Sequence, residues 1–190
     1  VEEILSGNWD VVVIVDEAYI DFGGRSALSL LEKYDNLLVV QTFSKSRAMA
    51  GMRIGFCIGS EKLIGYLNDV KFSFNSYTLN LPAQKLGAEA VRDDAYFHSV
   101  TGRIVRTRER VKKELRALGF SFPDSMANFI FASHEKIPAQ QLFAALRDAN
   151  IYVRYWNRPR ISESLRITVG TDEQMYTLLT FFRDYVSKAL

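Results

Sequence analysis

A run of five aliphatic residues at positions 11–15, VVVIV, constrains the fold of this chain more than any other segment. Every residue in it is β-branched, which favours an extended strand over a helix. A run without polar alternation suits a strand buried on both faces, as in a parallel sheet. Residues 37–41 and 53–58 predict two more strands, and residues 27–34 predict a short helix. Strands joined by short crossovers predict an α/β architecture.

The pattern changes in the second half of the chain. A long amphipathic helix is predicted over residues 94–118, because Ile104, Val111 and Leu115 lie on one stripe and Gly119 is a typical helix stop. Apolar periodicity predicts further helices at 82–92, 138–149 and 171–190, and strands at 128–132, 151–154 and 164–169. We place a domain boundary within the long helix, near residues 95–118, and divide the chain into residues 1–100 and 101–190.

Composition excludes several kinds of protein. The chain has 24 Lys and Arg against 22 Asp and Glu, and the resulting net charge of +2 creates no strong field for binding nucleic acid. Its longest aliphatic run is far shorter than the about 20 residues of a membrane-spanning helix. The single cysteine, Cys57, cannot form a disulfide within the chain, and together with His98 and His134 it gives no zinc-binding spacing. We therefore expect no metal site, no membrane segment and no nucleic-acid partner.

Basic residues gather in one segment of the predicted long helix, at positions 103–116. Glu109 and Glu114 interrupt them, and an apolar stripe runs along the same helix. This pattern predicts a solvent-exposed helix face rather than a nucleic-acid site.

Polar residues follow the first predicted strand. Asp16 comes directly after residues 11–15, at the carboxyl end of the strand, where parallel α/β sheets bind ligands. A turn beginning here would present Asp16 and Tyr19 toward one region, although an aspartate in this place can also simply cap a turn. An apolar strand ending in Asp-Glu also resembles the magnesium-binding strand of a P-loop ATPase. That alternative requires a G-x-x-x-x-G-K-[ST] loop, which these residues lack.

A second polar group follows the second predicted strand. Thr42, Ser44 and Lys45 come directly after residues 37–41, and Arg53 stands at the start of the third strand. Nearby glycines let the backbone pass close to a ligand. An arginine fork beside hydroxyl groups suits a phosphate dianion.

Together these side chains meet the chemical needs of pyridoxal 5'-phosphate. A lysine amine condenses with the aldehyde. A carboxylate keeps the pyridine nitrogen protonated, so that the ring can accept electrons. A phenol tunes the ring oxygen, and arginine with hydroxyl groups holds the phosphate. We therefore predict pyridoxal 5'-phosphate as the cofactor.

The order and spacing of these motifs resemble a known family. D-E-A-Y at 16–19, S-K at 44–45 and A-G-x-R-x-G at 50–55 are similar to the fold-type I aminotransferases. Within that superfamily, the spacing from Lys45 to Arg53 and the closing ESLRITVG at 163–170 most resemble the histidinol-phosphate aminotransferases. The resemblance covers nearly the whole chain. It implies that residues 1–100 are the carboxy-terminal part of a PLP-binding large domain, with a mainly parallel sheet, and that residues 101–190 are a small α+β domain.

The resemblance implies a role for each matching residue. Lys45 would be the catalytic residue, acting as Schiff-base lysine and proton shuttle. Asp16 would pair with the pyridine nitrogen, Ala18 would pack beneath the ring, and Tyr19 would bond the ring hydroxyl. The groups expected to bind the cofactor phosphate are Thr42, Ser44 and Arg53.

The substrate would be bound by two further arginines. Arg166 would bind the α-carboxylate, and Arg154 would bind the substrate's own phosphate. The implied reaction is transamination between histidinol phosphate and 2-oxoglutarate, in histidine biosynthesis, by a cytoplasmic homodimer. The aromatic residues Tyr152, Tyr155 and Trp156 are predicted to lie in the core or an interface rather than to line a binding site.

The family's catalytic chain is about twice as long as this one, so the chain resembles its carboxy-terminal half. The absent portion would carry a Gly-rich phosphate loop and an aromatic ring that stacks on the cofactor. Three alternatives remain open: an aromatic amino acid aminotransferase, a phospho-amino-acid decarboxylase, and a non-catalytic fragment that contributes half a site. We expect the isolated chain to be incomplete as an enzyme.

Overall fold

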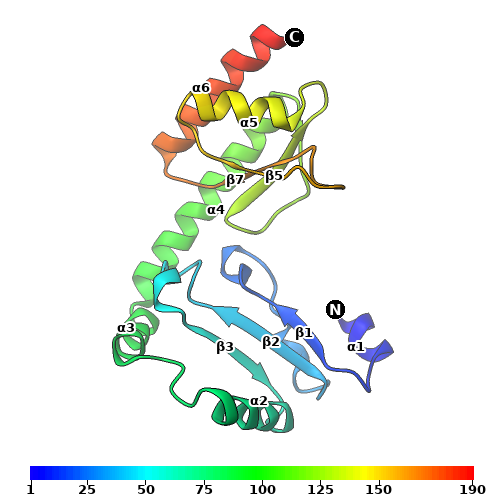
Figure 1. Ribbon diagram of the computed structural model, residues 1–190, viewed down its shortest axis with the longest axis vertical. Coiled ribbons are helices and arrows are strands. Elements are labelled where there is room, and N and C mark those ends of the chain that lie inside the picture. The colour runs from blue at the N-terminus through cyan, green and yellow to red at the C-terminus, as the bar shows by residue number, and fades with distance from the viewer. The chain divides into compact units, whose positions relative to one another are not determined.

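The computed structural model describes all residues, 1–190, and the chain divides into two compact units. Unit 1 comprises Val1–Val100, and unit 2 comprises Thr101–Leu190. Helix α4 (Asp94–Ala117) is continuous through the point at which the chain passes from unit 1 to unit 2 (Figure 1). No helix is both long enough and apolar enough to cross a membrane.

Unit 1 contains a three-stranded sheet in the order β1-β2-β3. Strand β1 (Val13–Asp16) pairs parallel with β2 (Leu37–Thr42), and β2 pairs antiparallel with β3 (Gly55–Gly59) (Figure 1). The mixed architecture of helices and sheet agrees with the predicted α/β class. The short helix expected over residues 27–34 is a single 3-10 turn, η2 (Ala27–Leu30).

The direction of β3 departs from an all-parallel arrangement for a local reason. A parallel crossover needs a connection long enough to return along the sheet, usually through a helix. Residues 43–54 contain only one turn of 3-10 helix, η3 (Ala50–Met52), so the chain turns back beside β2. The backbone N–H of Phe43 donates to the carbonyl of Ile54 and closes this turn, at 3.1 Å. As a result, the start of β3 lies beside the end of β2.

The expectation that residues 11–15 are buried on both faces is wrong. Strand β1 starts only at Val13, and its burial alternates, with Ile14 63% exposed. The covered face packs into a small core with Leu5 from α1 (Glu2–Gly7), Leu37 and Val39. β1 is an edge strand that pairs on one side only, and its second face has no covering layer in this chain.

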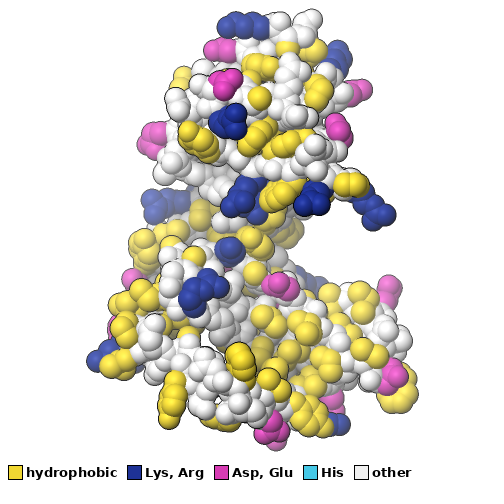
Figure 2. All heavy atoms as spheres, in the orientation of Figure 1, with side chains coloured by type: hydrophobic (Ala, Val, Ile, Leu, Met, Phe, Trp, Pro, Cys, Tyr) yellow, Lys and Arg dark blue, Asp and Glu magenta, His cyan; other side chains and the backbone are white.

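Two helices complete unit 1 before α4. Helix α2 (Glu61–Phe74) was not predicted, and α3 (Leu81–Arg92) was. The start of α3 follows from its sequence, since the Asn80 side chain accepts a hydrogen bond from the Ala83 N–H at 2.8 Å and a proline follows the first helical residue. Helix α2 buries no residue, and hydrophobic side chains are visible over much of unit 1, in the lower part of Figure 2.

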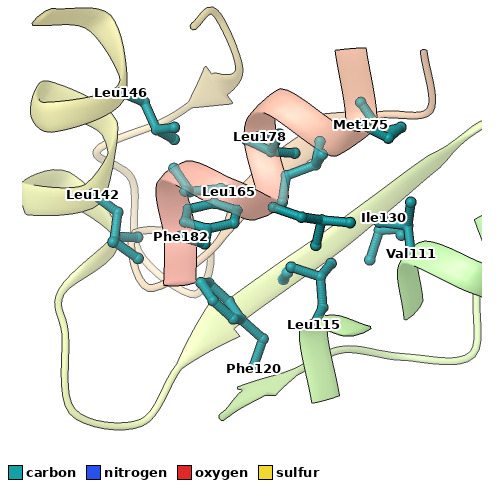
Figure 3. Packing of buried hydrophobic residues seen from close by; sticks show 14 of the residues in the cluster. Val111, Leu115, Phe120, Ile130, Leu142, Leu146, Leu165, Met175, Leu178 and Phe182 are labelled. Carbon is teal, nitrogen blue, oxygen red and sulfur yellow. The ribbon is translucent and has the colours of Figure 1, made fainter. Parts of the chain in front are cut away.

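Unit 2 is a four-stranded sheet, in the order β4-β5-β7-β6, with helices packed on it. Its strands are β4 (Phe120–Ser121), β5 (Phe129–His134), β6 (Arg154–Tyr155) and β7 (Leu165–Thr168), and its later helices are α5 (Ala139–Asp148) and α6 (Asp172–Ala189). Side chains from α4, α5, α6 and the strands meet in one buried core, in which Leu115, Phe120 and Phe182 lie close together (Figure 3). The predicted strand at 151–154 is shorter than expected and shifted to Arg154–Tyr155.

The prediction of a solvent-exposed basic face on α4 is wrong for two of its residues. Arg108 and Lys112 are buried, because their neighbours satisfy both charges. Arg108 donates to the Ala127 carbonyl at 3.0 Å and to Glu109 at 2.8 Å, and Lys112 pairs with Glu109 and Asp124. The other basic residues of the run are exposed, as predicted.

Candidate active site

Asp16 ends β1 on the open face of the sheet. Because β1 and β2 run parallel with Asp16 opposite Val40, the side chains of Asp16, Val40 and Thr42 lie on the same face. One oxygen of Asp16, Oδ1, accepts a hydrogen bond from the Ala18 N–H at 2.9 Å, which bends the chain toward Tyr19. The structure gives Oδ2 no hydrogen-bond partner, so this exposed oxygen can accept a hydrogen bond from an N–H or O–H group of a ligand.

Lys45 lies next to Tyr19, although the two residues come from different loops. The Lys45 Nζ is 5.7 Å from the centroid of the Tyr19 ring, within the range of a cation–π contact. No carboxylate forms an ion pair with Lys45. The structure therefore brings together the predicted amine and the predicted phenol, at the edge of the sheet where β1 and β2 end.

Thr42, Ser44 and Arg53 meet at the same edge because β3 is antiparallel to β2. The Thr42 hydroxyl contacts the Ser44 Oγ at 2.9 Å and the Ile54 carbonyl at 3.2 Å, and it accepts from the Ser44 N–H at 3.1 Å. Arg53 has a left-handed backbone, with φ 56°, and donates through Nη1 to the Ala50 carbonyl at 2.8 Å. The other guanidinium N–H groups of Arg53 have no acceptor in the structure.

The side chains at this edge fit pyridoxal 5'-phosphate in kind and in charge. Asp16 offers a carboxylate oxygen for a pyridine N–H, Lys45 offers an amine for an aldehyde carbon, and Tyr19 offers a phenol. Ser44 and Arg53 offer donors for a phosphate. Ala18, which lies in the sequence between Asp16 and Tyr19, is half-buried. Its N–H already donates to the Asp16 Oδ1.

Glu17 supports this edge of the sheet and was not predicted. Its carboxylate is only 6% exposed, yet it accepts from the Ser26 hydroxyl at 2.8 Å, the Ala27 N–H at 2.6 Å and the Gln41 side-chain amide at 2.9 Å. These donors belong to η2, with its N-cap Ser26, and to β2. Glu17 therefore joins both elements to the segment that follows β1. The partners lie 9, 10 and 24 positions from Glu17 in the sequence, which is why no local motif reveals it.

Arg47 anchors the loop that carries Lys45. Its guanidinium donates to the Ala90 carbonyl of α3 and lies 5.4 Å from the Phe43 ring centroid and 4.2 Å from that of Phe97. A pocket of about 870 Å³ is lined by residues 46–49 of this loop together with residues of η3, α3 and the start of α4, and none of the predicted cofactor residues is in its wall.

In unit 2, two arginines stand opposite each other on neighbouring strands. Arg154 of β6 pairs with Arg166 of β7 in register, so both side chains lie on one face of the sheet. Neither forms an ion pair, and the buried Nε of Arg166 has no hydrogen-bond partner. The Arg166 guanidinium lies 5.3 Å from the Phe129 ring centroid and 5.5 Å from that of Trp156. Like charges placed directly opposite are unfavourable without an anion between them, so this pair is suited to anionic groups.

The aromatic residues near these arginines divide between core and surface. Tyr155 packs on Phe143 with ring centroids 5.5 Å apart, which agrees with the predicted core role. Tyr152 is exposed, and Trp156 contacts Arg166 rather than the core. Asp16, Tyr19, Lys45 and the phosphate-type residues thus gather in unit 1, and Arg154 with Arg166 forms a separate group in unit 2.

Comparison with known proteins gives a consistent family. The family model described as "Aminotransferase class I and II" matches residues 2–182. A histidinol-phosphate aminotransferase of Lactococcus lactis subsp. cremoris is 53% identical over 186 residues, which are 98% of this chain and 52% of that protein. The chain therefore spans about half the length of the curated relatives it matches.

Solved structures share the fold. The histidinol-phosphate aminotransferase from Clostridium acetobutylicum superposes with a TM-score of 0.89 at 23% identity, over 98% of this chain and 58% of the other. The histidinol-phosphate aminotransferase from Sinorhizobium meliloti, solved in complex with pyridoxal-5'-phosphate, superposes with a TM-score of 0.84 at 22% identity, over 100% of this chain and 53% of the other.

Proposed function

Because this chain belongs to the class I and II aminotransferases, we propose that it forms half of a PLP-dependent enzyme that transfers an amino group from histidinol phosphate to 2-oxoglutarate. The proposal is supported by the identity of 53% to a histidinol-phosphate aminotransferase. The observation that carries it is the placement of Lys45, whose Nζ lies 5.7 Å from the Tyr19 ring at the sheet edge that also holds Asp16.

Each residue of this edge has a task under the proposal. The Asp16 carboxylate keeps a proton at the pyridine nitrogen, and Tyr19 donates to the ring oxygen. Ser44, Arg53 and Thr42 bind the phosphate, and Ala18 contacts the ring. Bound pyridoxal 5'-phosphate supplies an electron-accepting ring that stabilises negative charge developing at the substrate Cα. Lys45 would hold the cofactor through Nζ, and the same amine would carry the proton taken from the substrate Cα.

The two arginines of unit 2 bind the anionic ends of the substrate. Arg166 binds the carboxylate of 2-oxoglutarate and of the amino acid formed from it. Arg154 binds the phosphate that distinguishes histidinol phosphate from unphosphorylated amines. Unit 1 would then be part of the large domain and unit 2 the small domain of a homodimeric, cytoplasmic enzyme.

The substrate part of the proposal is tested by replacing each arginine in the longer protein of which we propose this chain to be half, which we call the full-length parent. Charged hydrogen bonds contribute about 1.5–3 kcal/mol, or roughly 10- to 150-fold. Arg154→Ala should lower kcat/KM for histidinol phosphate by that factor and leave unphosphorylated aromatic donors nearly unchanged. Arg166→Ala should lower kcat/KM for every carboxylate-bearing substrate alike.

Arg147→Ala, an exposed arginine of α5, is the matched control and should change neither value. Equal losses for phosphorylated and unphosphorylated donors in Arg154→Ala would contradict the role of Arg154 and favour an aromatic aminotransferase.

A further inference from the structure

Ser46 is a buried hydroxyl with a single charged partner. It is only 5% exposed, and its Oγ donates to the Asp21 Oδ2. A buried hydroxyl without a partner is costly, and a bond to a carboxylate is among the stronger hydrogen bonds in proteins. The contact therefore fixes the two residues relative to each other.

Both residues of this pair lie close in the sequence to residues of the candidate active site. Ser46 directly follows Lys45, and Asp21 lies in the 3-10 turn η1 (Ile20–Phe22), which begins directly after Tyr19. The bond thus joins the loop that carries the amine to the turn that carries the phenol, across 25 residues of sequence.

Three other hydrogen bonds of the Lys45 loop lead elsewhere. The Ala48 N–H donates to the Lys45 carbonyl at 3.2 Å, and the Met49 N–H donates to the Phe43 carbonyl at 3.1 Å, so both stay within the loop. Arg47 ties the loop to α3. Lysine has a long, flexible stem, so the place that its Nζ can reach depends on how firmly its backbone is held.

We propose that Asp21 and Ser46 are positioning residues that hold Lys45 against Tyr19, and so set how readily Lys45 binds the cofactor. The role of Lys45 in this statement rests on the proposed function. The pair itself acts on the backbone of two loops, and its effect is measurable without turnover.

The test uses the full-length parent, freed of cofactor. The protein is mixed with limiting pyridoxal 5'-phosphate and reduced with borohydride, and incorporation at Lys45 is followed by peptide mass spectrometry. Ser46→Ala and Asp21→Ala should each slow incorporation about tenfold, the size expected for loss of one charged hydrogen bond. The double variant should be no slower than either single variant, because both remove the same contact.

Three controls separate positioning from a general loss of structure. Asp21→Asn keeps an oxygen acceptor and should restore most of the rate. Reductive labelling of Lys45 with formaldehyde, which needs no bound orientation, should change less than about twofold. Ser29→Ala, at an exposed serine of η2, should match the unmodified protein.

Hydrogen exchange gives a readout that does not depend on the cofactor. The Phe22 and Ala48 amides are bonded within the two segments, so their exchange reports local opening. Ser46→Ala should speed exchange at Phe22, and Asp21→Ala should speed it at Ala48, with β2 unchanged. If pyridoxal 5'-phosphate is not incorporated at Lys45 even in the unmodified protein, the proposed function fails. The exchange rates alone then decide whether Asp21 and Ser46 hold the two segments together. The positioning role would be overturned if the two substitutions slowed incorporation additively in the double variant. It would also be overturned if neither substitution changed exchange in the segment opposite to it.

Discussion

Glu17 shows how one side chain can hold a site that it does not enter. Three donors, from Ser26, Ala27 and Gln41, converge on its buried carboxylate, which has no cationic partner in the structure. Glu17→Ala would leave these donors without an acceptor, each at a cost of about 1–3 kcal/mol where water cannot enter. We expect the variant to open η2 and the end of β2, with faster hydrogen exchange at the Ala27 amide.

Glu17→Gln is the matched control for this prediction, because it retains one oxygen acceptor for the Ala27 N–H. It should lose clearly less protection than Glu17→Ala. Equal exchange at Ala27 in both variants and in the unmodified protein would show that the carboxylate is not what holds η2.

Residue types and spacing predict the candidate catalytic and binding side chains. They do not predict the side chains whose hydrogen bonds position them. Asp16, Tyr19 and Lys45 all come shortly after apolar runs, so the topology of an α/β sheet is enough to bring them to one edge. The proposed role of Asp21 and Ser46 depends on the hydrogen bond between them, and no local sequence motif predicts a contact across 25 residues. Arg154 and Arg166 are predicted by resemblance, but their direct opposition depends on the register of β6 and β7.

At the scale of elements, the helices were predicted well where capping and periodicity agree. Helix α6 begins with a capping box, in which Thr171 accepts from the Gln174 N–H and Gln174 accepts from the Thr171 N–H. Helix α2 was missed because it buries no residue and has a weak apolar stripe. The one-sided burial of β1 could not be predicted, since it depends on which layers the chain supplies.

The junction of α6 with α4 makes a pH-dependent contribution to unit 2. A hydrogen bond from Arg110, with a second from Thr107, lowers the pKa of Asp172 below its ordinary value of 3.8. A carboxylate with a lowered pKa stabilises the fold above its ordinary pKa, and this contribution is lost as the pH falls through the folded-state value. We therefore expect the junction to weaken below about pH 4.

Urea unfolding followed by Trp156 fluorescence, in a Trp9→Phe background, measures this effect. Asp172→Asn should lower the unfolding midpoint at pH 6 by a small amount, as expected for an exposed ion pair, and the difference from the parent should vanish near pH 2. Asp148→Asn, at the end of α5, is the control. A difference that persists unchanged at pH 2 would mean that the charge on Asp172 does not contribute.

At the scale of the whole molecule, the two units differ in how much of their apolar surface is covered. Unit 2 has one continuous core with residues from α4, α5, α6 and four strands. Unit 1 has two small clusters and leaves Ile14, Phe74 and Tyr77 exposed, with Phe74 at 91%. Exposed apolar surface of this kind is typical of interaction sites. It agrees with a chain that spans about half the length of its relatives.

We therefore expect the isolated 190-residue chain to bind pyridoxal 5'-phosphate weakly and to turn over no detectable substrate. Misplacement of catalytic groups by about 1 Å can cost roughly 100-fold in rate, and missing groups cost more. The measurement is transaminase activity of the purified chain beside that of the full-length parent. Activity in the chain free of any longer protein would show that its own groups are sufficient.

The central claim is that Lys45 is the residue that binds the cofactor, and borohydride reduction tests it most directly. In the full-length parent loaded with pyridoxal 5'-phosphate, reduction should fix the cofactor to the peptide containing Lys45 and abolish the visible absorption of the bound form. Lys45→Ala should yield no fixed cofactor, whereas Lys33→Ala, at an exposed lysine of unit 1, should behave as the parent does. Fixation at another lysine of the unmodified protein, or undiminished fixation in Lys45→Ala, would contradict the account.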